Sequence, residues 1–234
     1  MAAALPYTYG TFFHNTGTEW LDDSGAPNFD EPGAVESIDT YATLLREYGP
    51  QGSINNTYTQ NSALFAQGRA AMAIESSNEY GVVADPENST VTDVMGVFPI
   101  PPGEGGNHPT VLQWGLSMSR FSENKEAAWE FMQWATSPDM MVQLALEGIV
   151  SPRASTSSDP RYDDQIDSEL RQEWEDALAL IKEEGHPEVA PPGARQEEIR
   201  TAIGEGIGAV ILGQLTPEEA ASQIQTQLEA LVEE

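Results

Sequence analysis

The stretch Ala63–Ile74, which reads ALFAQGRAAMAI, passes from a helical pattern to a strand pattern within one short block. Ser62–Gln67 has helical spacing, and Gly68 is the residue type that most readily ends a helix. The short apolar run Ala70–Ile74 that follows is typical of a buried strand. It opens into the polar loop Glu75–Glu79, so we expect polar side chains at the end of that strand. A helix followed directly by a buried strand indicates the α/β class.

Strand and helix patterns continue on both sides of this block. Val94–Ile100 and Val111–Ser119 are predicted as two further strands, separated by the Gly-rich loop Gly103–Asn107. Helices are expected over the ranges Ala34–Tyr48, Ser122–Ala135, Ser168–Glu184, Arg195–Leu212 and Glu218–Val232. Strands interspersed with helices predict an α/β fold for the chain as a whole.

Three positions read as helix starts. Ser122 is expected to cap its helix, although its acidic partner lies one residue beyond the usual capping-box spacing. Ser137 followed by Pro138 ends one helix and begins the next, and Thr216 followed by Pro217 begins the last.

The charge of the chain is strongly unbalanced, because 10 Lys and Arg face 38 Asp and Glu for a formal net charge of −28. Such self-repulsion strains a compact state in dilute buffer, whereas molar salt shortens the Debye length to about 3 Å and screens it. We therefore hypothesise a halophilic source, with an ordinary acidic mesophilic protein as the alternative. The same surface repels phosphate backbones and anionic lipids, so nucleic-acid binding and electrostatic membrane docking are disfavoured.

The sequence contains no Cys, which excludes disulfides and thiolate chemistry. No apolar run approaches the roughly 18 residues that a membrane span needs. Met1–Gly10 lacks the basic start and long apolar stretch of a signal peptide.

Motifs for catalysis or metal binding are weak. His14, His108 and His186 lie far apart and none forms an i, i+4 pair, so we expect no metal site and no cofactor. The glycine clusters lack the Lys and Ser/Thr of a phosphate loop, and no Ser has the flanking glycines of a nucleophile elbow. A chain with 38 carboxylates nevertheless leaves open a glycosidase-like acid/base pair.

Four stretches stand in an order that is more specific than any one of them. They are Tyr7–Trp20 with the helix Pro32–Tyr48 behind it, the block Ala63–Ile74, the pair QWGLSMSR (Gln113–Arg120) and ENKEAAWEFMQWATSP (Glu123–Pro138), and GIVSPRAS (Gly148–Ser155). In this order they resemble the family of extracellular solute-binding proteins type 1, whose best-known members bind maltose and related sugars.

The resemblance implies a two-lobed, periplasmic-binding-protein-like type II fold of the α/β class. It implies that residues 1–92 and 151–234 belong to the second, carboxyl-terminal lobe and residues 93–150 to an amino-terminal lobe that is incomplete. Members of the family begin with a signal segment and an amino-terminal lobe, so Met1 is expected to be an internal methionine of a longer protein or the start of a truncated reading frame. Apolar surface that earlier strands would cover is then expected to be exposed, which is an aggregation liability.

The resemblance also implies ligand-binding positions, which suit a sugar because aromatic rings stack on its C–H faces and polar groups bond its hydroxyls. Trp114 is the foremost candidate, because Gly115 permits close backbone approach; a buried lobe-core Trp is the alternative. Maltose-type members carry a Trp in the loop that here reads Glu75, Ser76, Ser77, Asn78, which indicates more hydroxyl bonding, a smaller ligand or simply a solvated turn. The full set of expected ligand-binding residues is Tyr7, Phe13, His14, Glu75, Ser77, Asn78, Gln113, Trp114, Gly115, Arg153 and Arg195.

Several of these positions have structural alternatives. Some of the aromatic residues between Tyr7 and His14 must face the core. Arg153 resembles a hinge-side Arg that forks onto hydroxyls, but a structural ion pair is an equal reading, and Arg195 is a weaker candidate of the same kind.

The expected function is therefore binding rather than catalysis. The chain is interpreted as the substrate-binding component of an ABC importer that holds a sugar or similar polyol in an interlobe cleft, with the permease subunits as partners. We expect a monomer at the extracellular face or cell surface. The alternatives are a carbohydrate-active hydrolase that uses paired carboxylates and a sensor module that keeps the fold.

Overall fold

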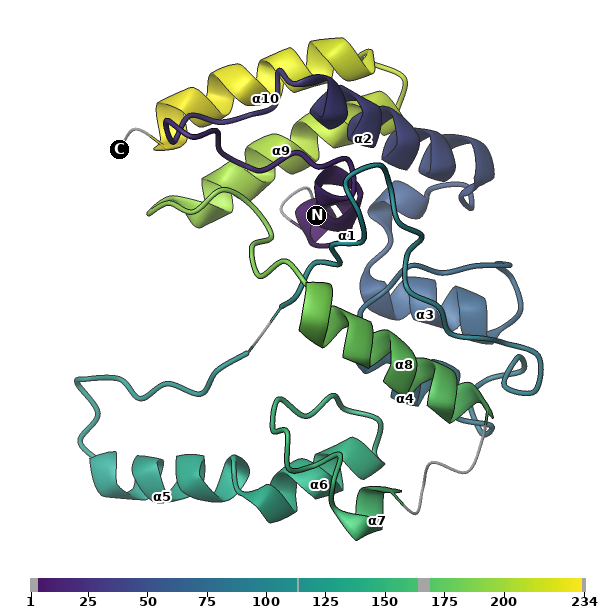
Figure 1. The fold of residues 1–234 in the computed structure, drawn as a ribbon, viewed down its shortest axis with the longest axis vertical. Coiled ribbons are helices and arrows are strands. Elements are labelled where there is room, and N and C mark those ends of the chain that lie inside the picture. Colours follow the sequence, from purple (N-terminus) through teal and green to yellow (C-terminus); the bar gives the residue numbers. More distant parts are fainter. Residues whose placement is uncertain (1–3, 113, 164–168, 233–234) are drawn as a thin grey trace. The chain divides into compact units, whose positions relative to one another are not determined.

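The computed structural model describes residues 4–112, 114–163 and 169–232, in which helices make up the regular secondary structure (Figure 1). The α-helices are α1 (Leu5–His14), α2 (Pro32–Thr43), α3 (Tyr58–Ala66), α4 (Tyr80–Val83), α5 (Lys125–Ala135), α6 (Pro138–Leu146), α7 (Pro160–Asp163), α8 (Glu169–Glu184), α9 (Gln196–Ile211) and α10 (Pro217–Val232). Shorter helical turns are η2 (Leu44–Tyr48), η3 (Ser53–Asn55) and η4 (Ser77–Glu79). Within these described ranges, no helix combines the length and the apolar character needed to cross a bilayer.

The chain divides into two compact units, each built from segments that are distant in sequence. Unit 1 contains residues 1–61, 99–112 and 179–234, and unit 2 contains residues 62–98 and 113–178. These boundaries differ from the lobe boundaries expected from the sequence, which fall after residues 92 and 150. The assignment of the segments to lobes stays a prediction.

Unit 1 is built around a core to which α1, α2, α9 and α10 all contribute (Figure 1). Tyr9 and Phe13 lie one helical turn apart on α1 and are both fully buried, as their i, i+4 spacing allows. Gly206 of α9 permits the close approach of α10, because a Cβ there would lie 2.6 Å from Cγ1 of Ile224. The indole Nε1 of Trp20 donates to the carbonyl of Glu188 at 3.1 Å, so this buried ring has its polar group satisfied.

Unit 2 contains α4 to α7 and parts of α3 and α8, and its buried set is smaller. Its buried apolar side chains include Val142, Tyr162, Trp174 and Leu178. Helix α5 has no buried residue. In the described residues, unit 2 therefore buries fewer apolar side chains than unit 1.

The expected helices are largely confirmed. The range Ala34–Tyr48 is formed by α2 and η2, α9 and α10 lie within two residues of their expected ends, and Ser137 does cap α6 by accepting from the backbone N–H of Met140 at 3.3 Å. The expected role of Ser122 is wrong. α5 begins only at Lys125, and the Ser122 hydroxyl accepts from the backbone of Asn124, one residue before that helix.

The three expected strands are not formed in the described residues. Residues 70–74, 94–100, 111–112 and 114–119 have irregular backbone, and β-pairing in the described ranges is limited to three isolated bridges, Leu21 with Pro27, Gly103 with Gly106, and Thr110 with His186. The physical reason is that a strand is stabilised by a ladder of hydrogen bonds to a neighbour, whereas the pairing of these segments in the described residues is limited to the bond from the N–H of Val111 to the carbonyl of His186 at 2.8 Å, beside the bridge at Thr110. Their apolar side chains are accordingly exposed, as Met72 (83%) and Phe98 (76%) show.

Candidate functional site

The polar loop of unit 2, residues 75–79, is held in place by hydrogen bonds on several sides. The Trp174 indole donates to the carbonyl of Ser77 at 3.3 Å, and the backbone N–H of Val150 donates to Oδ1 of Asn78 at 3.2 Å. Within the loop, the Ser76 hydroxyl accepts from the backbone N–H of Asn78. The loop is therefore an anchored structure, because its backbone and the amide of Asn78 are both fixed.

The segment 147–153 lies against this loop because two glycines allow it. A Cβ on Gly81 would lie 2.7 Å from the carbonyl oxygen of Glu147, and Gly148 has a φ of +81°, which favours glycine. The hydrogen bond between Asn78 and Val150 joins the same two segments. The structure thus brings the loop with Ser77 and Asn78 next to the segment that carries Arg153.

The guanidinium of Arg153 is engaged with the protein itself. Its Nη2 donates to the carbonyl of Thr136 at 2.7 Å, and its backbone N–H donates to the hydroxyl of Ser151. This places the exposed Arg153 at the end of α5, as a residue that ties two segments together. Glu75, on the other side of the loop, is partly buried.

Behind the polar loop lies a cluster that sequence reasoning missed. Tyr80 stacks on Trp174 with 4.7 Å between ring centroids, and the guanidinium of Arg171 lies over Trp174 at 4.4 Å and over Tyr162 at 4.8 Å. Burial is the first cause that raises the pKa of both Tyr80 and Tyr162. The signal in the sequence is the spacing of Arg171 and Trp174 by one helical turn, but their partners lie in other segments.

Trp114 is 84% exposed, so it is not a core residue. A Cβ on the neighbouring Gly115 would meet no atom within 4 Å outside its chain neighbours, so there is open space beside this backbone position. Gln113, the third residue of this predicted group, lies outside the described residues. An indole that is this exposed is available to stack on a ligand.

The site residues expected in unit 1 fall into different environments. Tyr7 accepts a hydrogen bond at its hydroxyl from Arg200, whose guanidinium lies 5.3 Å over the tyrosine ring. Phe13 is fully buried and stacks on Trp20 with 4.2 Å between centroids, so its ring packs in the core. Arg195 lies at the start of α9 and forms an ion pair with Glu198 at 2.6 Å. This is the structural ion pair that was the alternative to ligand binding.

His14 is buried at the end of α1, with 2% of its surface exposed. Its Nδ1 donates to the carbonyl of Thr18 at 3.1 Å, and its ring stacks on that of His186 with 3.6 Å between centroids. Burial, and then the positive charge of His186, lower the pKa of His14 to about 3. The imidazole is therefore neutral at physiological pH.

Carboxylates with a shifted pKa do not resemble a general acid, which needs a raised value. In the described residues, those whose pKa departs clearly from the ordinary value all have it lowered, and in each the first cause is a hydrogen bond. They are Asp22 with Ser24, Asp159 with Arg161 (to about 2), Glu198 with Arg195, and Glu218 with its own backbone N–H.

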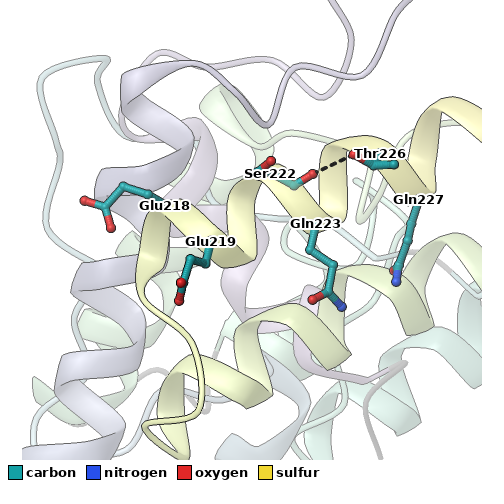
Figure 2. A pocket seen from close by; sticks show the side chains of 6 residues that line it. All are labelled: Glu218, Glu219, Ser222, Gln223, Thr226 and Gln227. Carbon is teal, nitrogen blue, oxygen red and sulfur yellow. Dashed lines mark hydrogen bonds between the residues drawn. The ribbon is translucent and has the colours of Figure 1, made fainter.

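One shallow surface hollow is lined by a single helix. Figure 2 shows its six lining residues, Glu218, Glu219, Ser222, Gln223, Thr226 and Gln227, all of which project from α10. The Thr226 hydroxyl donates to the backbone carbonyl of Ser222 at 3.0 Å, and the Glu219 carboxylate accepts from the backbone N–H of Thr216 at 2.9 Å. Polar groups on one convex helix do not surround a ligand, so we do not assign binding to this hollow.

Residues 2–142 match the family model of the bacterial extracellular solute-binding proteins, and the chain belongs to this family. The resemblance inferred from the four ordered stretches is thereby confirmed.

Curated relatives cover the chain to different extents. A periplasmic-binding protein of Sinorhizobium fredii, named for an amino-acid ABC transporter, is 25% identical over 96% of this chain and 49% of its own length. The mannitol-binding protein of Pseudomonas aeruginosa is 32% identical over 64% of this chain and 36% of its own length. The chain spans about half of the length of the first of these relatives and about a third of the second.

Solved structures show the same fold. The maltose-bound MalE3 protein of T. maritima has a TM-score of 0.86 at 24% identity, over 97% of this chain and 57% of that one. An ABC transporter solute-binding protein of Agrobacterium radiobacter K84, in complex with ribitol, has a TM-score of 0.84 at 25% identity, with the same coverage of 97% and 57%. The chain therefore has part of the α/β type II periplasmic-binding fold, as predicted.

Proposed function

We propose that this chain carries ligand-binding residues of the solute-binding component of an ABC importer, and that its ligand is a polyol or a related sugar. The observation that supports it most is the agreement of two relatives at 25% identity or more, one named for mannitol and one bound to ribitol. Both ligands are linear polyols, which offer many hydroxyls and no flat ring. A polar loop at the place where maltose-type members carry a Trp suits such a ligand.

In this proposal the residues of unit 2 have distinct roles. Trp114 lies along the carbon chain of the ligand, because its indole is exposed and apolar. Asn78 and Ser77 bond hydroxyls from a loop that is already fixed, so little conformational entropy is lost on binding. Glu75 and Arg153 are further hydroxyl partners, and Gln113 remains a prediction.

In unit 1, Tyr7 and Arg195 stay proposed contacts, because neither side chain is fully buried. The buried rings of Phe13 and His14 favour packing instead. We also keep the proposal that residues 93–150 belong to the amino-terminal lobe and the flanking segments to the second lobe.

The wider role follows from the family. We propose that the protein acts as a monomer at the extracellular face, that it delivers its ligand to permease subunits, and that it leaves the ligand chemically unchanged.

Calorimetric titration of the 234-residue chain in molar KCl tests the proposal. The ligands are mannitol, ribitol, maltose and an amino-acid mixture. We expect mannitol or ribitol to bind, and to raise the unfolding free energy by about 2.7 kcal/mol at 100 times the Kd, because only the native state binds. Trp114→Ala should weaken binding at least about tenfold, whereas Trp134→Ala on α5 serves as the exposed-Trp control.

Other outcomes would contradict the proposal. Binding of an amino acid alone would favour the ligand class for which the S. fredii relative is named. Release of monosaccharide from an oligosaccharide would favour the hydrolase alternative. Equal losses of ligand affinity in Trp114→Ala and Trp134→Ala would show that Trp114 does not contact the ligand.

We also propose that the net charge of −28 is an adaptation to high salt. Arginine ion pairs such as Arg195 with Glu198 and Arg200 with Glu197 occupy only a small part of the 38 carboxylates. Screening of the remainder by KCl should therefore raise the thermal unfolding midpoint. A midpoint that does not change between low and molar KCl would contradict this adaptation.

A further inference from the structure

Three potential metal ligands meet in unit 1, although they are far apart in sequence. His14 ends α1, Glu19 follows in the next loop, and His186 lies just after α8, 167 residues beyond Glu19. One ligand atom from each lies within 4.8 Å of the other two. Nε2 of His186 is 3.2 Å from Oε2 of Glu19, and Nδ1 of His14 is 3.7 Å from the same oxygen.

Both histidines are held by their surroundings. The ring of His14 is buried and packs edge-on against Trp20 with 5.0 Å between centroids. His186 is fixed through its backbone, because its N–H donates to the carbonyl of Pro109 and its carbonyl accepts from the N–H of Val111, both at 2.8 Å. A site on such supported elements is preorganised, and this reduces the cost of ordering on binding.

The hydrogen bonds of His14 leave one nitrogen without a partner. A carbonyl only accepts, so the bond to Thr18 requires the proton on Nδ1, and Nε2 then keeps its lone pair. Nε2 is buried and has no hydrogen-bond partner among the described residues. A buried acceptor without a partner is costly, and a bound ion would satisfy it. A carbonyl that orients the other nitrogen is also the usual support of a metal-binding histidine.

We propose that His14, Glu19 and His186 bind a divalent transition-metal ion of the zinc class. Two imidazoles and one carboxylate are ligands that suit Zn²⁺, Co²⁺ or Ni²⁺, whereas Mg²⁺ and Ca²⁺ prefer oxygen alone. Three protein ligands leave a fourth position for water. This site is separate from the proposed polyol-binding residues of unit 2, and its role is to join three segments of unit 1.

Binding requires a modest rearrangement. Metal bonds of about 2.0–2.1 Å in a tetrahedral site bring ligand atoms to about 3.3 Å from one another. The stacked imidazole planes, 18° apart, must open so that their lone pairs converge, and the ion must be reached by Nε2 of His14, because the Nδ1 that lies 3.7 Å from Glu19 carries the proton. His186 is the ring with room to turn, because 20% of its side chain is exposed, and its turn breaks the 3.3 Å hydrogen bond that its Nδ1 accepts from the backbone N–H of Glu188. The side chain of Glu19, 65% exposed, can follow.

Titration of the chelator-treated 234-residue chain with ZnSO₄ or CoCl₂ in molar KCl tests the site. The high salt suppresses diffuse binding by the acidic surface. We expect one tight site, with a visible Co²⁺ absorption of the tetrahedral type. Glu19→Gln and His186→Ala should each weaken binding by about 100-fold, and neither change removes a fully buried side chain, so both variants should fold. His108→Ala is the matched control, since the His108 imidazole is not one of the three ligands and its Nε2 lies 3.1 Å from the Gly105 carbonyl in its own loop.

Two results would overturn the site. Equal Zn²⁺ affinity in wild type and His186→Ala would show that the histidines are not ligands. Zn²⁺ binding no tighter than Ca²⁺ binding would indicate surface carboxylates. If the chain binds mannitol but fails these metal tests, the metal site is rejected and the proposed transport function still stands.

Discussion

Units 1 and 2 differ in how far they bury their large apolar side chains. In unit 1, aromatic and aliphatic residues of four helices bury one another, and Trp20 and Phe13 stack in the centre. In unit 2, α5 presents Trp129 (53%), Phe131 (55%) and Trp134 (56%) to solvent. The comparison teaches that the same residue types stabilise the chain in one unit and leave uncovered apolar surface in the other. We therefore expect unit 1 to hold most of the unfolding free energy.

The largest expected effect comes from deleting an aromatic side chain in the core of unit 1. Trp20→Ala removes a fully buried ring and its hydrogen bond to the Glu188 carbonyl, so it should lower the free energy of unfolding by about 3–5 kcal/mol. Trp134→Ala removes the same side chain from an exposed face and should change it by less than about 0.5 kcal/mol. Chemical denaturation of the two variants in molar KCl measures the difference.

Similar losses in the two variants would break the comparison between the units. A large loss in Trp134→Ala alone would mean that the face of α5 is covered in solution, for example by a second copy. Sedimentation at two protein concentrations distinguishes that case.

The next effect concerns the polar centre of unit 2. Arg171 lies over Trp174, Tyr162 and Tyr80, and its Nε is 3.6 Å from the Glu175 carboxylate. Arg171→Met keeps much of the volume but leaves Glu175 without this cation, so we expect a loss of about 1–3 kcal/mol.

Arg171→Lys is the matched variant for this prediction. It retains the charge but not the planar stacking, so its loss should be intermediate. In both variants, amide hydrogen exchange should become faster in peptides of α6 and α8 and should not change in peptides of α10. A Met variant as stable as wild type would show that apolar packing alone holds unit 2.

Most helices were predictable because their signals are local. Apolar periodicity and the Thr216–Pro217 start located α10, and Gly49 marked the end of η2. α1 was not predicted, because Tyr, Thr and Gly within it are poor helix formers. It forms because Tyr9 and Phe13 face the core, and because Gly10 lets the helix approach Thr110, whose hydroxyl would lie 2.6 Å from a Cβ. Tertiary packing overrides propensity there.

The strands and part of the site depend on partners that sequence patterns do not specify. The run at 70–74 has a strand composition, yet a strand also needs a neighbour at hydrogen-bonding distance. The polar loop was located from that run, but its anchor Trp174 is 97 residues from Ser77 in sequence. In the same way, the local spacing of the histidines gave no sign that His186 stacks on His14. Contacts between distant segments are what a single sequence leaves open.

A smaller effect concerns the core of unit 1, whose stability should depend on pH through Tyr9. Tyr9 donates to the Ser37 hydroxyl at 2.7 Å, which donates to the Ala34 carbonyl at 2.7 Å, and burial raises the pKa of Tyr9. The unfolded chain loses this phenolic proton above about pH 10 and the folded chain keeps it, so stability falls as pH rises beyond that point.

Tyr9→Phe should cost about 1 kcal/mol at neutral pH, because a buried hydrogen bond is lost. Relative to wild type it should recover about 1.4 kcal/mol at pH 11, because it has no proton to lose. Urea denaturation at the two pH values measures both numbers. A constant difference between wild type and variant would contradict the burial of the Tyr9 hydroxyl.

The smallest effect compares one helix cap in each unit. The Thr216 hydroxyl accepts from the backbone N–H of Glu219, whose carboxylate accepts from the backbone N–H of Thr216, so α10 begins with a capping box. The Ser137 hydroxyl caps α6 in unit 2. Thr216→Ala and Ser137→Ala should each cost about 1 kcal/mol. If the units open separately, hydrogen exchange will rise in α10 alone for the first variant and in α6 alone for the second; a rise in both helices for either variant would show that the two units open as one.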